Sequence, residues 1–163
     1  MVSYRLDALA LAAIAAATLD SWTTYYFIAH GLGVEANPIL APLARHSLIW
    51  VPDYLLAKPL LIPAMPDVCR QAFATGFLAA SLLCGINNLC GIYAGKFILV
   101  DLLGFPAIVA VSVLSGLLVF VYQLLSKGAG RELVLRSVAI AVCWIIIFIA
   151  VDATFYFGAH LLG

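Results

Sequence analysis

The chain has 163 residues, of which 66% are hydrophobic and only 10% are charged, and its formal net charge is zero. A soluble domain carries roughly 25% charged residues, so this composition cannot cover a surface that faces water. The neutral balance also excludes the basic face that a nucleic-acid-binding protein needs. We therefore predict one integral membrane domain over residues 1–163, with the lipid bilayer as its partner and no nucleic acid.

Five apolar runs follow one another along the chain, and a membrane-spanning helix needs about 20 such residues. They cover about residues 6–29, 49–65, 71–94, 97–125 and 132–161, and the second is short and interrupted by three prolines. The expected fold class is an all-α integral membrane bundle of five transmembrane helices, the second of them Pro-broken. The apolar segment 38–48 either lies at the membrane interface or enters the membrane as a re-entrant piece.

The basic residues predict the orientation of the five spans, because cytoplasmic loops carry an excess of Lys and Arg. With the N-terminus in the cytoplasm, five basic residues fall inside, two fall outside, and Lys58 lies within a span. The inside set is Arg5, Arg70, Lys127, Arg131 and Arg136, and the outside pair is Arg45 and Lys96. We predict a multi-pass protein of the cell membrane with its C-terminus outside the cytoplasm.

The first span carries a carboxylate, Asp20, beyond its midpoint. A charge within hydrocarbon costs roughly 2.5–3.5 kcal/mol on insertion scales, so such a residue indicates a functional site. Thr23 and Thr24 follow at helical spacing and share the face of Asp20.

Further polar residues fall at similar depth near the outer ends of the other spans, whereas the inner halves are almost wholly Ala, Leu, Val and Ile. This segregation predicts a ligand-binding or translocation site open to the outside, with Lys58 beneath it. Its residues are Asp20, Thr23, Thr24, Glu35, Asn37, Lys58, Asn87, Asn88 and Asp152.

Each of these residues also has a purely structural interpretation. Asp20 and Lys58 form, in that case, a buried ion pair that fixes helix register. Asn87 and Asn88 then join helices by hydrogen bonds, and Glu35 and Asn37 shape a turn.

Two other patterns concern partners and cofactors. Gly91 and Gly95 form a GxxxG pair on the third span, which lets another helix approach closely and predicts a homo-oligomer or a membrane-complex partner there. The four cysteines lack the Cys/His spacing of a zinc site. We predict no metal and no cofactor.

The order Asp20-x-x-Thr23-Thr24, Glu35-x-Asn37-Pro38, Lys58 and Asn87-Asn88 resembles a family of small prokaryotic polytopic membrane proteins that is known only as a domain of unknown function. The resemblance covers most of the first three spans. It supplies no activity, and the residues that it singles out are Asp20, Thr24, Glu35, Asn37, Pro38, Lys58 and Asn88.

Three functions fit these observations. The first is binding or translocation of a proton, a cation or a small polar solute at the outward-facing site. The second is an accessory or scaffolding subunit of a membrane complex. The third is an intramembrane enzyme acting on a lipid at the outer leaflet, which the missing nucleophile and HExxH motifs disfavour.

Overall fold

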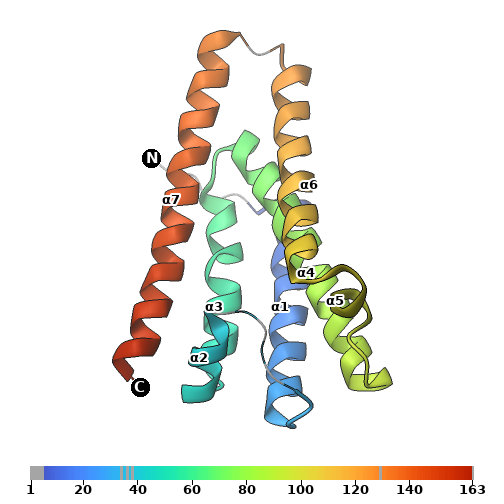
Figure 1. Ribbon diagram of the computed structural model, residues 1–163. Coiled ribbons are helices and arrows are strands. Elements are labelled where there is room, and N and C mark those ends of the chain that lie inside the picture. Colours follow the sequence, from blue (N-terminus) through green and yellow to red (C-terminus); the bar gives the residue numbers. More distant parts are fainter. Residues whose placement is uncertain (1–5, 34, 36, 38, 129, 163) are drawn as a thin grey trace.

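The computed structural model describes residues 6–33, 35, 37, 39–128 and 130–162, and every regular element in this part is helical, as predicted (Figure 1). Two residues of the sequence argument, Arg5 and Pro38, lie outside the described residues. The elements are α1 (Ala8–Ala29), α2 (Leu40–His46), α3 (Trp50–Ala57), the 3₁₀-helix η1 (Pro59–Ala64), α4 (Asp67–Ala94), α5 (Ile98–Leu103), α6 (Phe105–Ser126) and α7 (Arg131–Leu162).

Three helices in the described part are long and apolar enough to cross a membrane: Asp67–Ala94, Pro106–Ser126 and Arg131–Gly158, in α4, α6 and α7. These helices make the chain a membrane-embedded helical protein. The 22-residue α1 is not among the three, and its second half carries the polar cluster from Asp20 to Thr24.

Contacts between distant residues fix the direction of each long helix. At their first turns α1 and α4 meet through Asp7 and Arg70, and further along they meet through Asp20 and Asn88, so the two helices run parallel. The α6 helix runs back along α4, because Gln123 near its end hydrogen-bonds Gln71 near the start of α4. Figure 1 shows α7 running in the opposite direction to α6.

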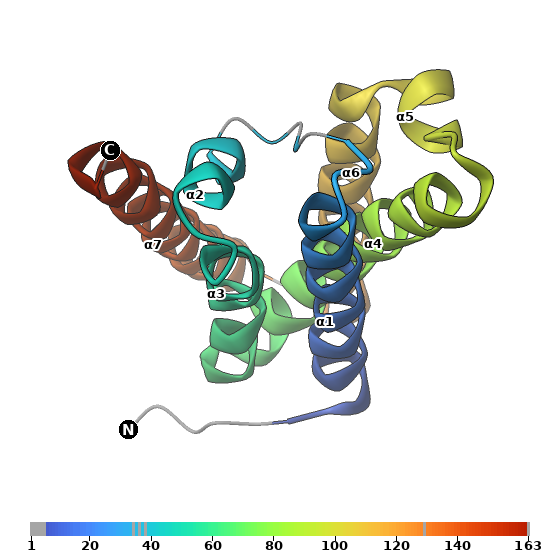
Figure 2. The same cartoon turned by 90° about the horizontal axis from the view of Figure 1, so that it is seen from below.

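The Pro-broken second run is confirmed. Its first part forms α3, and its second part forms the 3₁₀-helix η1, which contains Pro59 and Pro63. Lys58 stands at the junction of the two. Figure 2 shows α3 between α1 on one side and α7 on the other.

The segment after α1 contains α2, which packs on α3 and α7 at the end of the bundle where α1 ends. Leu40 and Leu43 of α2 are buried with Val51 and Tyr54 of α3, and Phe155 of α7 packs against this cluster. The part of segment 38–48 that the structure describes is therefore a short helix held by protein contacts.

The fourth run was expected to be one continuous helix over residues 97–125, and this expectation is wrong. Gly104 adopts φ +76° and ψ 152° and separates α5 from α6. An L-residue with a side chain rarely adopts such a conformation, so glycine there permits the break.

A close helix contact joins α4 and α6, and it depends on glycines. A Cβ atom at Gly116 would lie 2.8 Å from the Ala72 carbonyl oxygen, and one at Gly76 would lie 3.1 Å from the Ser112 carbonyl oxygen. Small residues let helix backbones approach in this way in membranes.

The predicted GxxxG pair has other roles within the chain. The Phe97 ring covers Gly91, where a Cβ would lie 2.4 Å from the ring, and Gly95 ends α4 with φ +66°. The partner predicted at this pair stays a prediction.

An ion-pair cluster holds the opposite end of the bundle. The Asp7 carboxylate caps α1 by accepting a hydrogen bond from the Ala10 N–H at 2.8 Å, and it pairs with Arg70 at 2.7 Å. Arg70 also pairs with Asp67 at 2.6 Å. The Ala10 N–H and then the Arg70 guanidinium hold the pKa of Asp7 below its usual value, against the opposing effect of burial.

We expect Gly116→Ala to lower the free energy of unfolding by about 1–3 kcal/mol, because the added methyl group forces α6 away from α4. Gly158→Ala is the control, since a Cβ there meets no atom within 4 Å. Thermal unfolding in detergent measures both. Equal stability of the two variants would contradict this packing.

The Asp7 cluster predicts a loss of stability in acid. A carboxyl whose pKa is lowered by folding stabilises the protein above its unfolded pKa, and this contribution disappears as the pH falls through the folded value. Between about pH 6 and about pH 3, the melting temperature of Asp7→Asn should fall less than that of the wild type, since Asn keeps the helix cap and loses the charge. The exposed Asp53 provides a control as Asp53→Asn, and an identical acid response in all three proteins would argue against the idea.

Candidate functional site

The site begins with Asp20 on α1 and Asn88 on α4. The side-chain nitrogen of Asn88 donates to Asp20 Oδ1 at 3.3 Å and to Thr24 Oγ1 at 2.8 Å. The Thr24 hydroxyl also donates to Asp20 Oδ1 at 3.4 Å. The structure thus brings these three residues of the predicted site together.

Thr23 completes this polar group. Its hydroxyl donates to the Asp20 carbonyl oxygen at 3.0 Å and accepts from the Asn88 side-chain nitrogen at 3.3 Å. Thr23 is fully buried, and Asp20 and Thr24 are 7% and 5% exposed. The group therefore lies within protein, away from lipid.

Gly85 explains how α1 and α4 come close enough to form the group. A Cβ at Gly85, one turn before Asn88, would lie 3.6 Å from the Asp20 Cα and from the Asp20 backbone nitrogen. A larger residue there would separate the two helices and lengthen the bonds of Asn88.

A second polar group joins α3 and α7. Lys58 Nζ pairs with Asp152 Oδ1 at 2.5 Å, and the Tyr54 hydroxyl donates to the same oxygen at 3.0 Å. The Lys58 ammonium also lies 5.5 Å from the centroid of the Tyr54 ring. The Asp20–Lys58 ion pair considered from the sequence is not formed, because Lys58 has Asp152 as its partner.

Two further residues of the predicted site, Glu35 and Asn37, lie between α1 and α2. Glu35 Oε1 accepts from the Asn37 N–H at 2.8 Å, and Asn37 Oδ1 accepts from the N–H groups of Ile39 and Leu40 at 2.9 and 3.3 Å. Both side chains thus shape the entry into α2, as the structural interpretation predicted.

The charge of Glu35 also reaches further. Glu35 interacts electrostatically with Asp20 of α1 and with Tyr54 of α3. Its carboxylate thus lies near enough to both the Asp20 group and Tyr54 for its charge to act on them.

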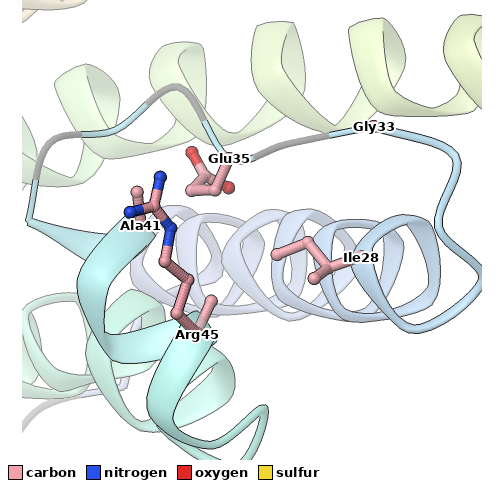
Figure 3. Close-up of a pocket in the computed structure, with 6 residues that line it drawn as sticks. Ile28, Gly33, Glu35, Ala41 and Arg45 are labelled. Carbon is pink, nitrogen blue, oxygen red and sulfur yellow. The ribbon is translucent and has the colours of Figure 1, made fainter. Parts of the chain in front are cut away.

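A cavity of about 90 Å³ opens beside Glu35. It is lined by Ile28, Gly33, Glu35, Ala41, Ala44 and Arg45, and Figure 3 shows the Arg45 side chain pointing toward Glu35. A water needs about 10–15 Å³ of such space, so the cavity has room for several waters.

Asn87, adjacent to Asn88 in sequence, has a different role. Its side-chain oxygen accepts from the N–H groups of Leu99 and Val100 at 3.0 and 3.1 Å. These are unsatisfied donors in the first turn of α5. Asn87 is therefore the cap of α5, and the structure does not bring it into the Asp20 group.

Two residues of the site were missed from the sequence. Tyr54 was not among the predicted site residues, and Arg45 was counted only as an outside charge. The spacing of Tyr54 four residues before Lys58 was the available signal, because residues so spaced share a helix face.

The chemistry of the site is that of hydroxyl, amide and carboxylate oxygens. In the part of the chain that the structure describes, no group of three or more His, Cys, Asp or Glu side chains is arranged to hold a metal ion. All four cysteines are free thiols.

Comparisons of the chain with protein-family models, with curated proteins and with solved structures found no match. The resemblance drawn from the short motifs stays a prediction.

The two polar groups predict different energetic couplings for Lys58. In a double-mutant cycle, Lys58→Met and Asp152→Asn should show a coupling energy of about 1–3 kcal/mol, since each single change leaves the other residue without its partner. Lys58→Met combined with Asp20→Asn should be additive within about 0.5 kcal/mol. Denaturation in mixed micelles measures both cycles. A larger coupling of Lys58 with Asp20 than with Asp152 would contradict this assignment and support an Asp20–Lys58 pair.

Proposed function

We propose that the chain is a five-span membrane protein whose outward-facing site binds and translocates a proton or a small cation, with Asp20 as the binding carboxyl. The five spans are α1, α3 with η1, α4, α6 and α7. The 22 residues of α1 extend about 33 Å at 1.5 Å each, enough to cross a bilayer core. The α3–η1 segment is shorter, about 24 Å. It contacts the helices α1, α2 and α4.

The orientation follows from charge. Four basic residues lie at or near the end of the bundle where α4 and α7 begin and α6 ends: Arg70, Lys127, Arg131 and Arg136. Arg45 and Lys96 lie toward the opposite end. The positive-inside rule places the first end in the cytoplasm. The Asp20 group and the cavity beside Glu35 then lie toward the outside of the cell membrane.

The single observation that carries the proposal is the environment of Asp20. Its carboxylate is buried, its hydrogen-bond donors are the neutral side chains of Thr24 and Asn88, and no Lys or Arg among the described residues forms a salt bridge with it. An isolated buried carboxylate is costly. The neighbouring charge of Glu35 adds to this cost, so Asp20 is suited to hold a proton or a cation.

The rest of the bundle supports an outward-open binding state. The cavity beside Glu35 lies at the end of the bundle that this orientation places outside. On the inner side, an apolar core of Ala10, Ala13, Ile62, Met65, Cys69, Ala74 and Phe148 closes the bundle. Translocation then requires a second arrangement, and the Pro-broken junction at Lys58 offers the place for a bend.

Two measurements on Asp20→Asn test the proposal. Infrared difference spectra of the wild type during a pH or salt titration should show a carboxyl band that changes, and this band should be missing in the variant. In liposomes the proton or cation flux of the variant should be at least tenfold lower than that of the wild type, because Asn cannot carry the negative charge of Asp20.

Asp101→Asn is the matched control, since Asp101 is exposed on α5, and it should retain both signals. Flux and spectra that are unchanged by Asp20→Asn would contradict the proposal.

A further inference from the structure

A larger cavity lies at the other end of the bundle, between the beginnings of α4 and α7. Its volume is about 300 Å³, and ligand pockets measure roughly 300–1,000 Å³. One wall is the start of α4, residues 66–69, and the other is a face of α7 with Leu133, Arg136, Ser137 and Ile140. The two helices meet beside it, where the Cys69 thiol lies 3.9 Å from the Ser137 carbonyl oxygen.

Ser137 brings an available hydroxyl to this cavity. The residue is only 5% exposed, and its hydroxyl has no hydrogen-bond partner among the described residues. Every fully covered side-chain oxygen in this part of the chain has a partner, so the Ser137 hydroxyl must reach open space. The cavity is the space that Ser137 lines. A hydroxyl placed there can donate to a ligand or accept from one.

Arg136 brings a positive charge to the same wall. It is exposed, and it forms no salt bridge with any residue that the structure describes. Asp67 is the acidic side chain on the cavity wall, and its carboxylate pairs with Arg70 at 2.6 Å. The charge of Arg136 therefore has no ion-pair partner within the described part of the protein.

The start of α4 adds backbone donors. No side chain caps this helix, and its first helical hydrogen bond runs from the Arg70 N–H to the Pro66 carbonyl oxygen at 2.8 Å. The N–H groups of Val68 and Cys69 precede that bond, so they have no acceptor within the helix. The N-terminus of a helix favours negative charge, and its N–H groups bind phosphate in many proteins.

We propose that this cavity binds the phosphate headgroup of an anionic phospholipid. Arg136 and Ser137 supply the side-chain ligands, and the start of α4 supplies the backbone ligands. A guanidinium can donate two parallel hydrogen bonds to a phosphate, and basic pockets between transmembrane helices bind anionic headgroups. This site lies apart from the Asp20 group and goes beyond the proposed function.

The surroundings of the cavity favour a lipid over a soluble phosphate. Leu133, Leu135 and Val138 of α7 are 42%, 60% and 43% exposed, and α4 and α7 are both long and apolar enough to cross a membrane. Acyl chains can therefore cover these side chains while the headgroup occupies the cavity.

The charges of the cavity favour an anionic headgroup over a zwitterionic one. A zwitterionic headgroup carries its own positive charge, which would leave that of Arg136 without compensation. Its ammonium group would also have to compete with Arg70 for the Asp67 carboxylate.

The test is the stability of the purified full chain in detergent with added lipid. A ligand that binds only the folded state raises the melting temperature with its concentration. Phosphatidylglycerol should raise the melting temperature, and phosphatidylcholine should need at least a tenfold higher mole fraction for the same shift. Native mass spectrometry of the wild type should show bound phosphatidylglycerol, and this measurement needs no variant.

Variants locate the effect. Arg136→Gln should need at least tenfold more phosphatidylglycerol for the same shift, and Arg136→Lys, which keeps the charge, should lose less. Ser137→Ala should weaken binding about threefold, as expected for the loss of one neutral hydrogen bond. Arg131→Gln is the matched control, because Arg131 is an exposed basic residue of α7 outside the cavity wall, and it should retain the wild-type response.

Equal responses to phosphatidylglycerol and phosphatidylcholine, or equal losses in Arg136→Gln and Arg131→Gln, would overturn the site. If inorganic phosphate alone produces the same shift as phosphatidylglycerol, the lipid is not the ligand and the proposal is wrong. Asp20→Asn should keep the response to phosphatidylglycerol, so failure of this site and failure of the proposed function give different results.

Discussion

The arrangement of this protein depends on the cost of an unsatisfied polar group in an apolar medium. Among the described residues, every buried side-chain nitrogen and oxygen has a hydrogen-bond partner. In a membrane this requirement is strict, because no water in the bilayer core can replace a missing partner. Each polar residue placed within a helix therefore forces a particular neighbour, and these neighbours determine which helices meet.

The parallel pair of α1 and α4 illustrates this constraint. Asp7 and Arg70 join the two helices at one end, and Asp20 and Asn88 join them further along. Two polar contacts at separate depths fix both the direction and the register of the pair. Gly85 then permits the close approach that these contacts need. The α3–η1 segment is held in a similar way on its other side, where Lys58 and Tyr54 meet Asp152 of α7.

Composition and hydropathy were sufficient to predict a helical membrane protein and the positions of its long helices, because hydrocarbon admits few other structures. The break at Gly104 was not predictable in the same way, since a single glycine within an apolar run is compatible with a continuous helix. The depth of the polar residues predicted the meeting of Asp20, Thr24 and Asn88. The partner of Lys58 was not predictable from depth, because Asp20 and Asp152 both lie in outer halves and only the packing of α3 between α1 and α7 distinguishes them.

The two carboxylates that flank α3 now differ in one physical respect. Asp152 has the charge of Lys58 beside it, so this pair is neutral and contributes to the packing of α7. Asp20 has only neutral donors and the negative charge of Glu35 nearby. A positive charge is therefore missing at one carboxylate and present at the other, at similar depth in the same bundle. This asymmetry distinguishes Asp20, the centre of the proposed site, from Asp152, which pairs with Lys58 between α3 and α7.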